Sequence, residues 1–289
     1  MKLDICTHSY DMMNTALDAN LFEFSKPEDF QEGRILLIDK PLEWTSFDVV
    51  NKVRFLIRRH CGFKKIKVGH AGTLDPLATG VLVICTGRMT KQINRFLVDN
   101  KCYDGAMRLG ATTASYDREQ PEENVQTDES VATLTLEGLQ GLVAERFVGE
   151  ISQVPPQFSA KKVDGRRAYK SARKGQEVVL QPVDVVVSRF EVGPLTAGEP
   201  GRGAELAFEI DCSKGTYIRA LGRDLGEAAG CGAYLSKLRR TRSGEFSLAD
   251  CHQLDALEAR IEQLAHLAIP TDSVSPPPSP APQKNEGLD

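Results

Sequence analysis

The chain has 289 residues, of which 41% are hydrophobic and 26% are charged, as is ordinary for soluble globular proteins. It has no apolar run of about 18 residues, so the sequence predicts no membrane span, and residues 1–33 have no signal-peptide core. Its seven cysteines form no Cys-x-x-Cys pair, which argues against a disulfide framework and a zinc site and predicts a reduced, cytoplasmic setting.

The net charge of −4 is unevenly distributed along the chain. Residues 1–33 and 248–289 each carry seven acidic and two basic residues, so residues 34–247 carry 32 basic and 26 acidic ones. A basic central segment suits binding to a polyanion, while acidic ends also aid solubility. We therefore expect an acidic N-terminal extension at 1–33, a core at 34–247, a short helical segment at 248–269 and a disordered proline-rich tail at 270–289.

The spacing of apolar residues predicts strands and helices along the core. Predicted strands cover residues 34–40, 80–85, 101–109, 183–192 and 205–211, while predicted helices follow a cap at Thr45 or Ser46 and cover 134–148 and 216–227. These elements do not follow a regular βαβ rhythm. The order favours an α+β fold around a mixed sheet.

The most informative segment is the run from Val68 to Leu82, VGHAGTLDPLATGVL. Its single carboxylate, Asp75, lies in a glycine-rich bend between two apolar stretches. Glycines permit backbone conformations that other residues avoid, and Pro76 fixes its own φ angle and suits the first turn of a helix. Asp75 is then either the cap of a helix beginning at Pro76 or a carboxylate presented by a stiff loop at the mouth of a cleft.

This run resembles the catalytic motif of the TruB-type tRNA pseudouridine synthases. The whole chain resembles a short form of that family, without a complete C-terminal PUA domain. Five further segments resemble that family in the same order: LIDKPLEWTS from Leu37 (with Glu43 where glycine is common), KCY from Lys101, QVPPQFSAKK from Gln153, KGTYIRAL from Lys214 and LRRT from Leu238. The resemblance implies the pseudouridine synthase fold. In that fold a mixed, largely antiparallel sheet with flanking helices surrounds a central active-site cleft.

The resemblance also implies an activity, the isomerisation of uridine to pseudouridine in the T-loop of tRNA, at position 55. The base is flipped out, the glycosidic bond is cleaved, the uracil rotates and a C–C bond forms. We therefore expect an RNA isomerase that is a monomer, has tRNA as its partner and needs no cofactor, metal, nucleotide or membrane. The alternatives are an RNA-binding protein or tRNA-folding chaperone with little or no catalysis, and a pseudouridine synthase acting on another RNA site.

A nucleotide-dependent enzyme is a weaker alternative, prompted by the run CTGRMTK at residues 85–91. That run lacks the Gly-x-x-x-x-Gly-Lys-Ser/Thr spacing with which a loop wraps phosphates, so the sequence disfavours it.

By resemblance, the catalytic residues are Asp75, Tyr103 and Arg219. Asp75 would act as a nucleophile or as a base that removes a sugar proton. Arg219 is expected to pair with it, because a desolvated carboxylate needs a partner and a guanidinium can hold one in a fixed orientation. Tyr103 offers a ring on which the flipped uracil could stack, although core packing is the alternative that an alternating strand favours.

Other residues are expected to bind the RNA. The predicted substrate-binding residues are His70, Lys40, Tyr217, Leu238, Gly72 and Thr73. Among them, Lys40 could contact a phosphate or brace the catalytic loop, and His70 could fill the space that the uridine vacates. The predicted contacts to the RNA backbone, all basic, are Lys161, Lys162, Arg166, Arg167, Lys170, Arg239 and Arg240.

Overall fold

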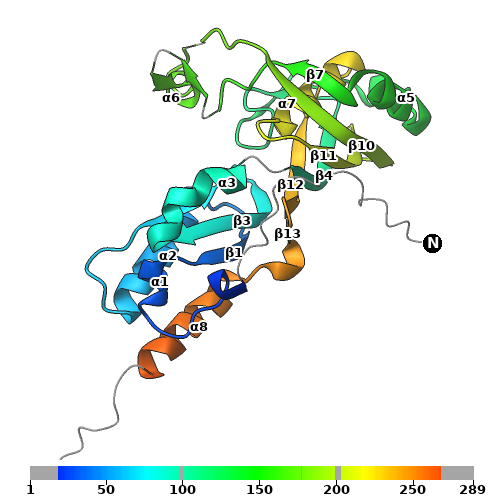
Figure 1. Cartoon of the computed structure of the whole chain (residues 1–289). Helices are drawn as coiled ribbons and strands as arrows, with labels where there is room; N and C mark the ends of the chain where they lie inside the picture. Colours follow the sequence, from blue (N-terminus) through cyan, green and yellow to red (C-terminus); the bar gives the residue numbers. More distant parts are fainter. Residues whose placement is uncertain are drawn as a thin grey trace, which may run out of the picture.

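The computed structural model describes residues 19–97, 100–159, 161–163, 165–176, 178–198 and 203–267 (Figure 1). The predicted tail at 270–289 and the first 18 residues of the predicted N-terminal extension lie outside the described residues. The helices are α1 Asp29–Glu32, α2 Ser46–His60, α3 Ile93–Leu97, α4 Asp128–Ala132, α5 Leu136–Arg146, α6 Ala168–Ala172, α7 Ile218–Ala228 and α8 Leu254–Leu267, with short 3-10 turns η1 Ala19–Leu21, η2 Gly87–Gln92 and η3 Leu248–Asp250. Within this described part, no helix has the length and apolar character needed to cross a membrane.

One mixed sheet runs through the molecule in the order β1-β3-β12-β4-β11-β10-β7, with β2 beside β3 and β13 beside β12. The strands are β1 Ile35–Lys40, β2 Val68–Ala71, β3 Ala78–Thr86, β4 Lys101–Leu109, β5 Thr112–Thr113, β6 Glu122–Glu123, β7 Gly149–Gln153, β8 Lys162–Val163, β9 Arg166–Arg167, β10 Val183–Ala197, β11 Ala204–Cys212, β12 Ala233–Ser243 and β13 Phe246–Ser247. Neighbours in this sheet pair antiparallel, except that β3 and β12 run parallel. The predicted α+β fold with a largely antiparallel mixed sheet is confirmed.

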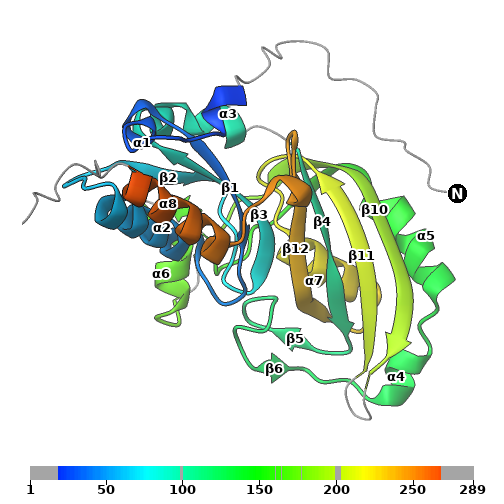
Figure 2. The ribbon, with the colours of Figure 1, turned by 90° about the horizontal axis from the view of Figure 1, so that it is seen from below.

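The core is divided along this sheet. At one end, β4, β10, β11 and β12 pack against α5 and α7 (Figure 2). At the other end, β1 and β3 are covered on both faces. Leu36 and Ile38 face α2 and α8, whereas Ile35 and Leu37 face η2, α3 and β13. Successive side chains of a strand point to opposite faces, so a strand buried on both sides reads as the continuous apolar run seen in β1.

Helix α2 begins with a capping box at Thr45. The Thr45 hydroxyl accepts a hydrogen bond from the Asp48 N–H, and the Asp48 carboxylate accepts one from the Thr45 N–H. The other predicted cap, Ser46, is buried instead and exchanges two hydrogen bonds with Leu74. The first turn of α2 is thereby fixed to the loop between β2 and β3.

Part of the predicted N-terminal extension packs into the body of the protein. Phe24 and Phe30 are buried in the cluster that lies between α2, α8 and the sheet. The Arg260 guanidinium of α8 lies over the Phe24 ring, 4.3 Å from its centroid. The domain boundary at residue 33 stays a prediction, but residues 24–30 contribute to the core.

Candidate active site

Asp75 lies in the loop that joins β2 to β3. Pro76 and Leu77 form a turn, the Ala78 N–H donates to the Asp75 carbonyl at 3.1 Å, and β3 starts at Ala78. The alternative in which Asp75 caps a helix beginning at Pro76 is therefore wrong, and Asp75 lies in a loop, as the other alternative predicted. Strand β3 forms here because β1, β2 and β12 offer hydrogen-bonding partners to its apolar run.

Lys40, at the end of β1, is completely buried. Its Nζ donates to the main-chain carbonyls of Pro41, Trp44 and Pro76, the last at 3.2 Å. Burial lowers the pKa of Lys40 to about 8, although the Asp75 carboxylate acts in the opposite direction. The prediction that Lys40 contacts the substrate is therefore wrong, because its side chain has no exposed surface. Its contacts are those of the alternative role, a brace of the loop that carries Asp75.

Arg240, predicted to contact the RNA backbone, is also buried, with 1% of its surface exposed. Its Nε donates to the Val81 carbonyl at 2.8 Å and its Nη2 to the Gly72 carbonyl at 3.1 Å. The prediction is wrong for this residue, since its guanidinium cannot reach a phosphate. The neighbouring Arg239 has a side chain that is 37% exposed and binds Asp39 at 2.7 Å, so a phosphate can still approach it.

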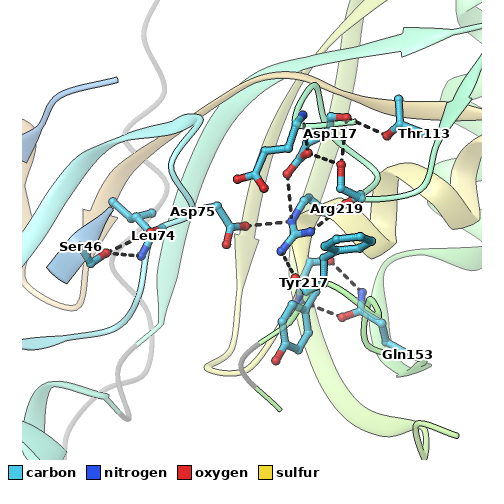
Figure 3. A network of polar contacts seen from close by, with 11 residues as sticks. Ser46, Leu74, Asp75, Thr113, Asp117, Gln153, Tyr217 and Arg219 are labelled. Atoms are coloured by element: carbon cyan, nitrogen blue, oxygen red, sulfur yellow. Dashed lines mark hydrogen bonds and ion pairs between the residues drawn. The ribbon is translucent and has the colours of Figure 1, made fainter. Parts of the chain in front are cut away.

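Arg219 lies between two carboxylates at the centre of the site (Figure 3). Its Nε donates to Asp75 Oδ2 at 2.8 Å and lies 3.5 Å from Asp117 Oδ2. Its Nη1 and Nη2 donate to the carbonyls of Ser115 and Phe158 at 2.7 and 2.8 Å. Burial acts against the charge on Arg219, but the two carboxylates outweigh it and raise its pKa. All three guanidinium nitrogens have partners, which fixes the orientation of the group and of the Asp75 oxygen that it holds.

Asp117 is a site residue that the motifs did not indicate. It lies between β5 and β6, and its Oδ1 accepts from the Ser115 hydroxyl at 2.5 Å and from the Glu119 N–H at 2.9 Å. The Thr113 hydroxyl donates to its carbonyl at 2.7 Å. The sequence feature that could have indicated Asp117 is the polar segment that follows the predicted strand 101–109, because residues beyond the end of a strand often lie at a functional site.

Asp75 is the open end of this network. Its side chain is 38% exposed, compared with 6% for Arg219 and 6% for Asp117. Among the described residues, its Oδ1 has no hydrogen-bond donor, whereas Oδ2 is held by Arg219. The cleft at this point is lined by Asp75, Leu77, Ala78, Asp117, Arg219, Leu235, Ser236, Lys237 and Leu238. A reacting group can therefore approach the carboxylate from the cleft.

Tyr103 lies on β4 directly opposite Arg240 of β12. Its ring is partly buried and packs on the apolar cluster of β4, β10, β11 and β12. Burial raises the pKa of Tyr103, the nearby Arg240 guanidinium lowers it, and Asp75 raises it. Tyr103 thus has both a core contact and electrostatic contact with the site, so its stacking on uracil stays a prediction.

Other predicted substrate-binding residues surround this centre. Tyr217 precedes α7, and its N–H and carbonyl pair with the amide of Gln153, at 2.8 and 3.1 Å (Figure 3). Burial and the Arg240 charge lower the pKa of His70, which favours its neutral form. Its Nδ1 is buried without a hydrogen-bond partner in the described part of the chain. Thr73 is exposed in the loop that carries Asp75.

The predicted basic patch follows β7. Lys161 is exposed, and its carbonyl accepts from the Ala168 N–H at 2.8 Å. Strands β8 and β9 form a small antiparallel hairpin that leads into α6 (Figure 1). The side chains of Lys162, Arg166, Arg167 and Lys170 lie outside the described part of the structure, so their contact with RNA stays a prediction.

Comparisons with known proteins identify the family. The family model described as "TruB family pseudouridylate synthase (N terminal domain)" matches residues 58–218, and "tRNA pseudouridylate synthase B C-terminal domain" matches 219–274. The tRNA pseudouridine synthase B of Phocaeicola vulgatus is 49% identical over 81% of this chain and 96% of its own length. That of Flavobacterium johnsoniae is 40% identical over 82% and 99%. This chain belongs to the TruB family of pseudouridylate synthases.

Solved structures support the fold. A structure of an H/ACA RNP bound to a substrate RNA containing 2′-deoxyuridine matches with a TM-score of 0.57 at 24% identity, over 89% of this chain and 64% of the other. A Cbf5-Nop10-Gar1 complex matches with a TM-score of 0.55 at 26% identity, over 87% and 66%. The predicted pseudouridine synthase fold and the predicted family are therefore confirmed.

Proposed function

We propose that this chain isomerises uridine to pseudouridine in the T-loop of tRNA, at position 55. The observation that carries the proposal is the pairing of Asp75 with Arg219 at the open end of a cleft, 2.8 Å apart. The curated relatives that match most of the chain carry the name tRNA pseudouridine synthase B. A single oriented carboxylate is the group that this reaction needs.

The reaction breaks the bond between C1′ of the ribose and N1 of the uracil, turns the uracil and joins C1′ to C5. C5 releases its proton and N1 gains one. No oxidant or reductant is needed, because the product is an isomer of the substrate. Oδ1 of Asp75 attacks the sugar or removes a sugar proton, while Arg219 holds Oδ2. The uridine must leave its stack to reach this carboxylate, so the base is flipped into the cleft.

We assign the other predicted residues to binding of the flipped nucleotide and its neighbours. The Tyr103 ring stacks on the uracil, and Tyr217 and Leu238 form walls of the base pocket. His70 fills the space that the uridine vacates or holds the flipped RNA, and Gly72 and Thr73 bind the substrate beside it. Phosphates are held by Arg239 and by the basic residues Lys161, Lys162, Arg166, Arg167 and Lys170. We place the protein in the cytoplasm as a monomer that acts on tRNA without a cofactor.

The test is to incubate the protein with unmodified tRNA and to map pseudouridine at nucleotide resolution. Pseudouridine at position 55 supports the proposal, and pseudouridine only elsewhere would assign the enzyme to another RNA site. Tight tRNA binding with no pseudouridine would favour the RNA-folding alternative. The ion pairs that Arg219 makes with Asp75 and Asp117 argue against that alternative, because RNA binding alone has no use for them.

Asp75→Asn separates catalysis from binding. It keeps the shape of the side chain and removes the charge that the chemistry uses, so isomerisation should be abolished while tRNA affinity changes by less than about threefold. Product formation is measured in a single turnover and affinity by filter binding. A rate within about tenfold of the wild type, roughly 1.4 kcal/mol of barrier, would refute the assignment of Asp75.

A further inference from the structure

Arg240 is a buried cation to which the proposed mechanism assigns no role. Among the fully buried side chains of the described residues, it is the largest. No carboxylate of the described residues lies within 4.0 Å of its guanidinium nitrogens. The guanidinium donates to two main-chain carbonyls and also makes a side-chain hydrogen bond with Tyr103. Burying a charge without an opposite charge is costly, so such a group points to a task other than simple packing.

The two carbonyls lie on either side of the catalytic carboxylate. Gly72 precedes Asp75 in the loop, and Val81 follows it in β3, so one guanidinium spans the turn between them. Gly72 has a φ of 83°, and a Cβ atom there would lie 3.4 Å from Arg240 Nη1. The loop therefore rests directly on the guanidinium, and its path depends on that group.

The same side chain faces the strand that carries Tyr103. Arg240 and Tyr103 are direct partners in the antiparallel pairing of β12 with β4, and directly opposed residues project to the same face of a sheet. Burial raises the pKa of the Tyr103 phenol and the Arg240 charge lowers it, which agrees with a phenol close to the guanidinium. Arg240 thus contacts the catalytic loop, β3 and the β4 tyrosine at once.

We propose that Arg240 is a positioning residue, which holds the Asp75 loop and Tyr103 in the one arrangement that the reaction requires. This inference rests on the proposed function. The planar guanidinium can bond Val81 and Gly72 simultaneously, whereas the single head of a lysine cannot reproduce both directions. The residue acts through Asp75 and Tyr103 and needs no contact with RNA.

The experiment compares Arg240→Lys with the wild type and with a matched control. Arg108→Lys is the control, because Arg108 is 6% exposed on β4 but does not line the cleft. Single-turnover rates are measured at saturating protein with unmodified tRNA, and affinities are measured for each substitution combined with Asp75→Asn. Arg240→Lys should lower the rate at saturation by about 100-fold or more and change the affinity by less than about threefold. Arg108→Lys should lose stability but keep its rate within about threefold.

A second variant perturbs the same contact and leaves the buried charge in place. Gly72→Ala introduces a Cβ against Arg240 Nη1 in a conformation that side chains rarely adopt. It should lower the rate at saturating protein, where a change in affinity does not count, and the double variant with Arg240→Lys should be far less impaired than the product of the two single effects. If Arg240→Lys does not fold, Arg240→Gln takes its place in the same comparison with Gly72→Ala.

The inference is overturned if either variant keeps its saturating rate within about threefold of the wild type, or if the whole loss lies in tRNA affinity. It is also overturned if Arg108→Lys loses as much rate as Arg240→Lys. A wild-type protein that forms no pseudouridine would instead refute the proposed function, so the two failures are distinguishable.

Discussion

Arg219→Lys tests whether the site depends on the shape of the guanidinium or only on its charge. Lysine keeps one positive charge and can approach Asp75, but it cannot also serve the carbonyls of Ser115 and Phe158, which now accept bonds at 2.7 and 2.8 Å. An acceptor left unsatisfied in a buried place costs about 1–3 kcal/mol, so the unfolding free energy should fall by about 2–4 kcal/mol. Because the Asp75 oxygen loses its fixed orientation, the single-turnover rate should fall at least about 100-fold.

The assay combines two measurements on one preparation. Urea unfolding is followed by fluorescence of Trp44, the single tryptophan of the chain, and the rate by tritium release from tRNA labelled at C5 of uridine. Arg189→Lys is the control, because Arg189 pairs with Glu191 and Glu209 in an exposed setting, where loss should cost less than about 1 kcal/mol. If Arg219→Lys matched Arg189→Lys in stability and kept its rate within about threefold, the guanidinium would not organise the site.

Three further predictions use the same measurements. Asp117→Asn leaves Arg219 with one charged partner and should lower the saturating rate by about tenfold with unchanged tRNA affinity; an unchanged rate would remove Asp117 from the site. Tyr103→Phe should retain binding of the flipped base and Tyr103→Leu should weaken it, whereas equal RNA binding by both would return Tyr103 to core packing. Burial raises the pKa of the Cys85 thiol to about 12, so on raising the pH the thiol ionises in the unfolded chain before it ionises in the folded protein. The stability that comes from keeping this thiol protonated is complete below about pH 9 and is lost as the pH rises towards 12. Between pH 8 and 10, Cys85→Val should therefore lose about 1.4 kcal/mol less stability in urea unfolding than the wild type, and equal losses would contradict the shift.

The strands β10 and β11 were predicted because their apolar residues repeat with a period of two, and β1 and β3 because they are continuous apolar runs, whereas the central strand β12 was not predicted. The strand predicted at 101–109 has the bounds of β4, whereas the one predicted at 183–192 continues to Ala197 as β10. Strand β10 passes the Gly193-Pro194 pair with a shift of register between Val192 and Leu195 and goes on pairing with β11. Such an irregularity depends on the partner strand, which a local pattern does not contain.

In the candidate site, too, the sequence predicted what local motifs determine and missed what depends on distant parts of the chain. The predicted Asp75–Arg219 pair is present, because both residues lie in segments with distinctive motifs. Arg240 was placed at the RNA as a member of a basic cluster, and a phosphate contact was one of two roles predicted for Lys40, whereas both side chains are buried. No strand was predicted over β12, so the sequence did not show that the adjacent Arg239 and Arg240 point to opposite faces and that only one of them can face the RNA. Which face is open became visible only with the sheet assembled.

The loop of residues 72–76 is held by groups that come from three separate parts of the chain. Arg240 binds its first carbonyl from 168 residues away, Ser46 binds its middle from 28 residues away, and Lys40 binds the Pro76 carbonyl from 36 residues away. A loop with few internal contacts would let a carboxylate turn towards its counter-ion and away from the substrate. Holding the main chain at three points leaves the side chain of Asp75 little freedom except the orientation that Arg219 selects, which is the preorganisation that a catalytic carboxylate requires. Substitutions at these anchors should therefore affect the rate of isomerisation more than the affinity for tRNA.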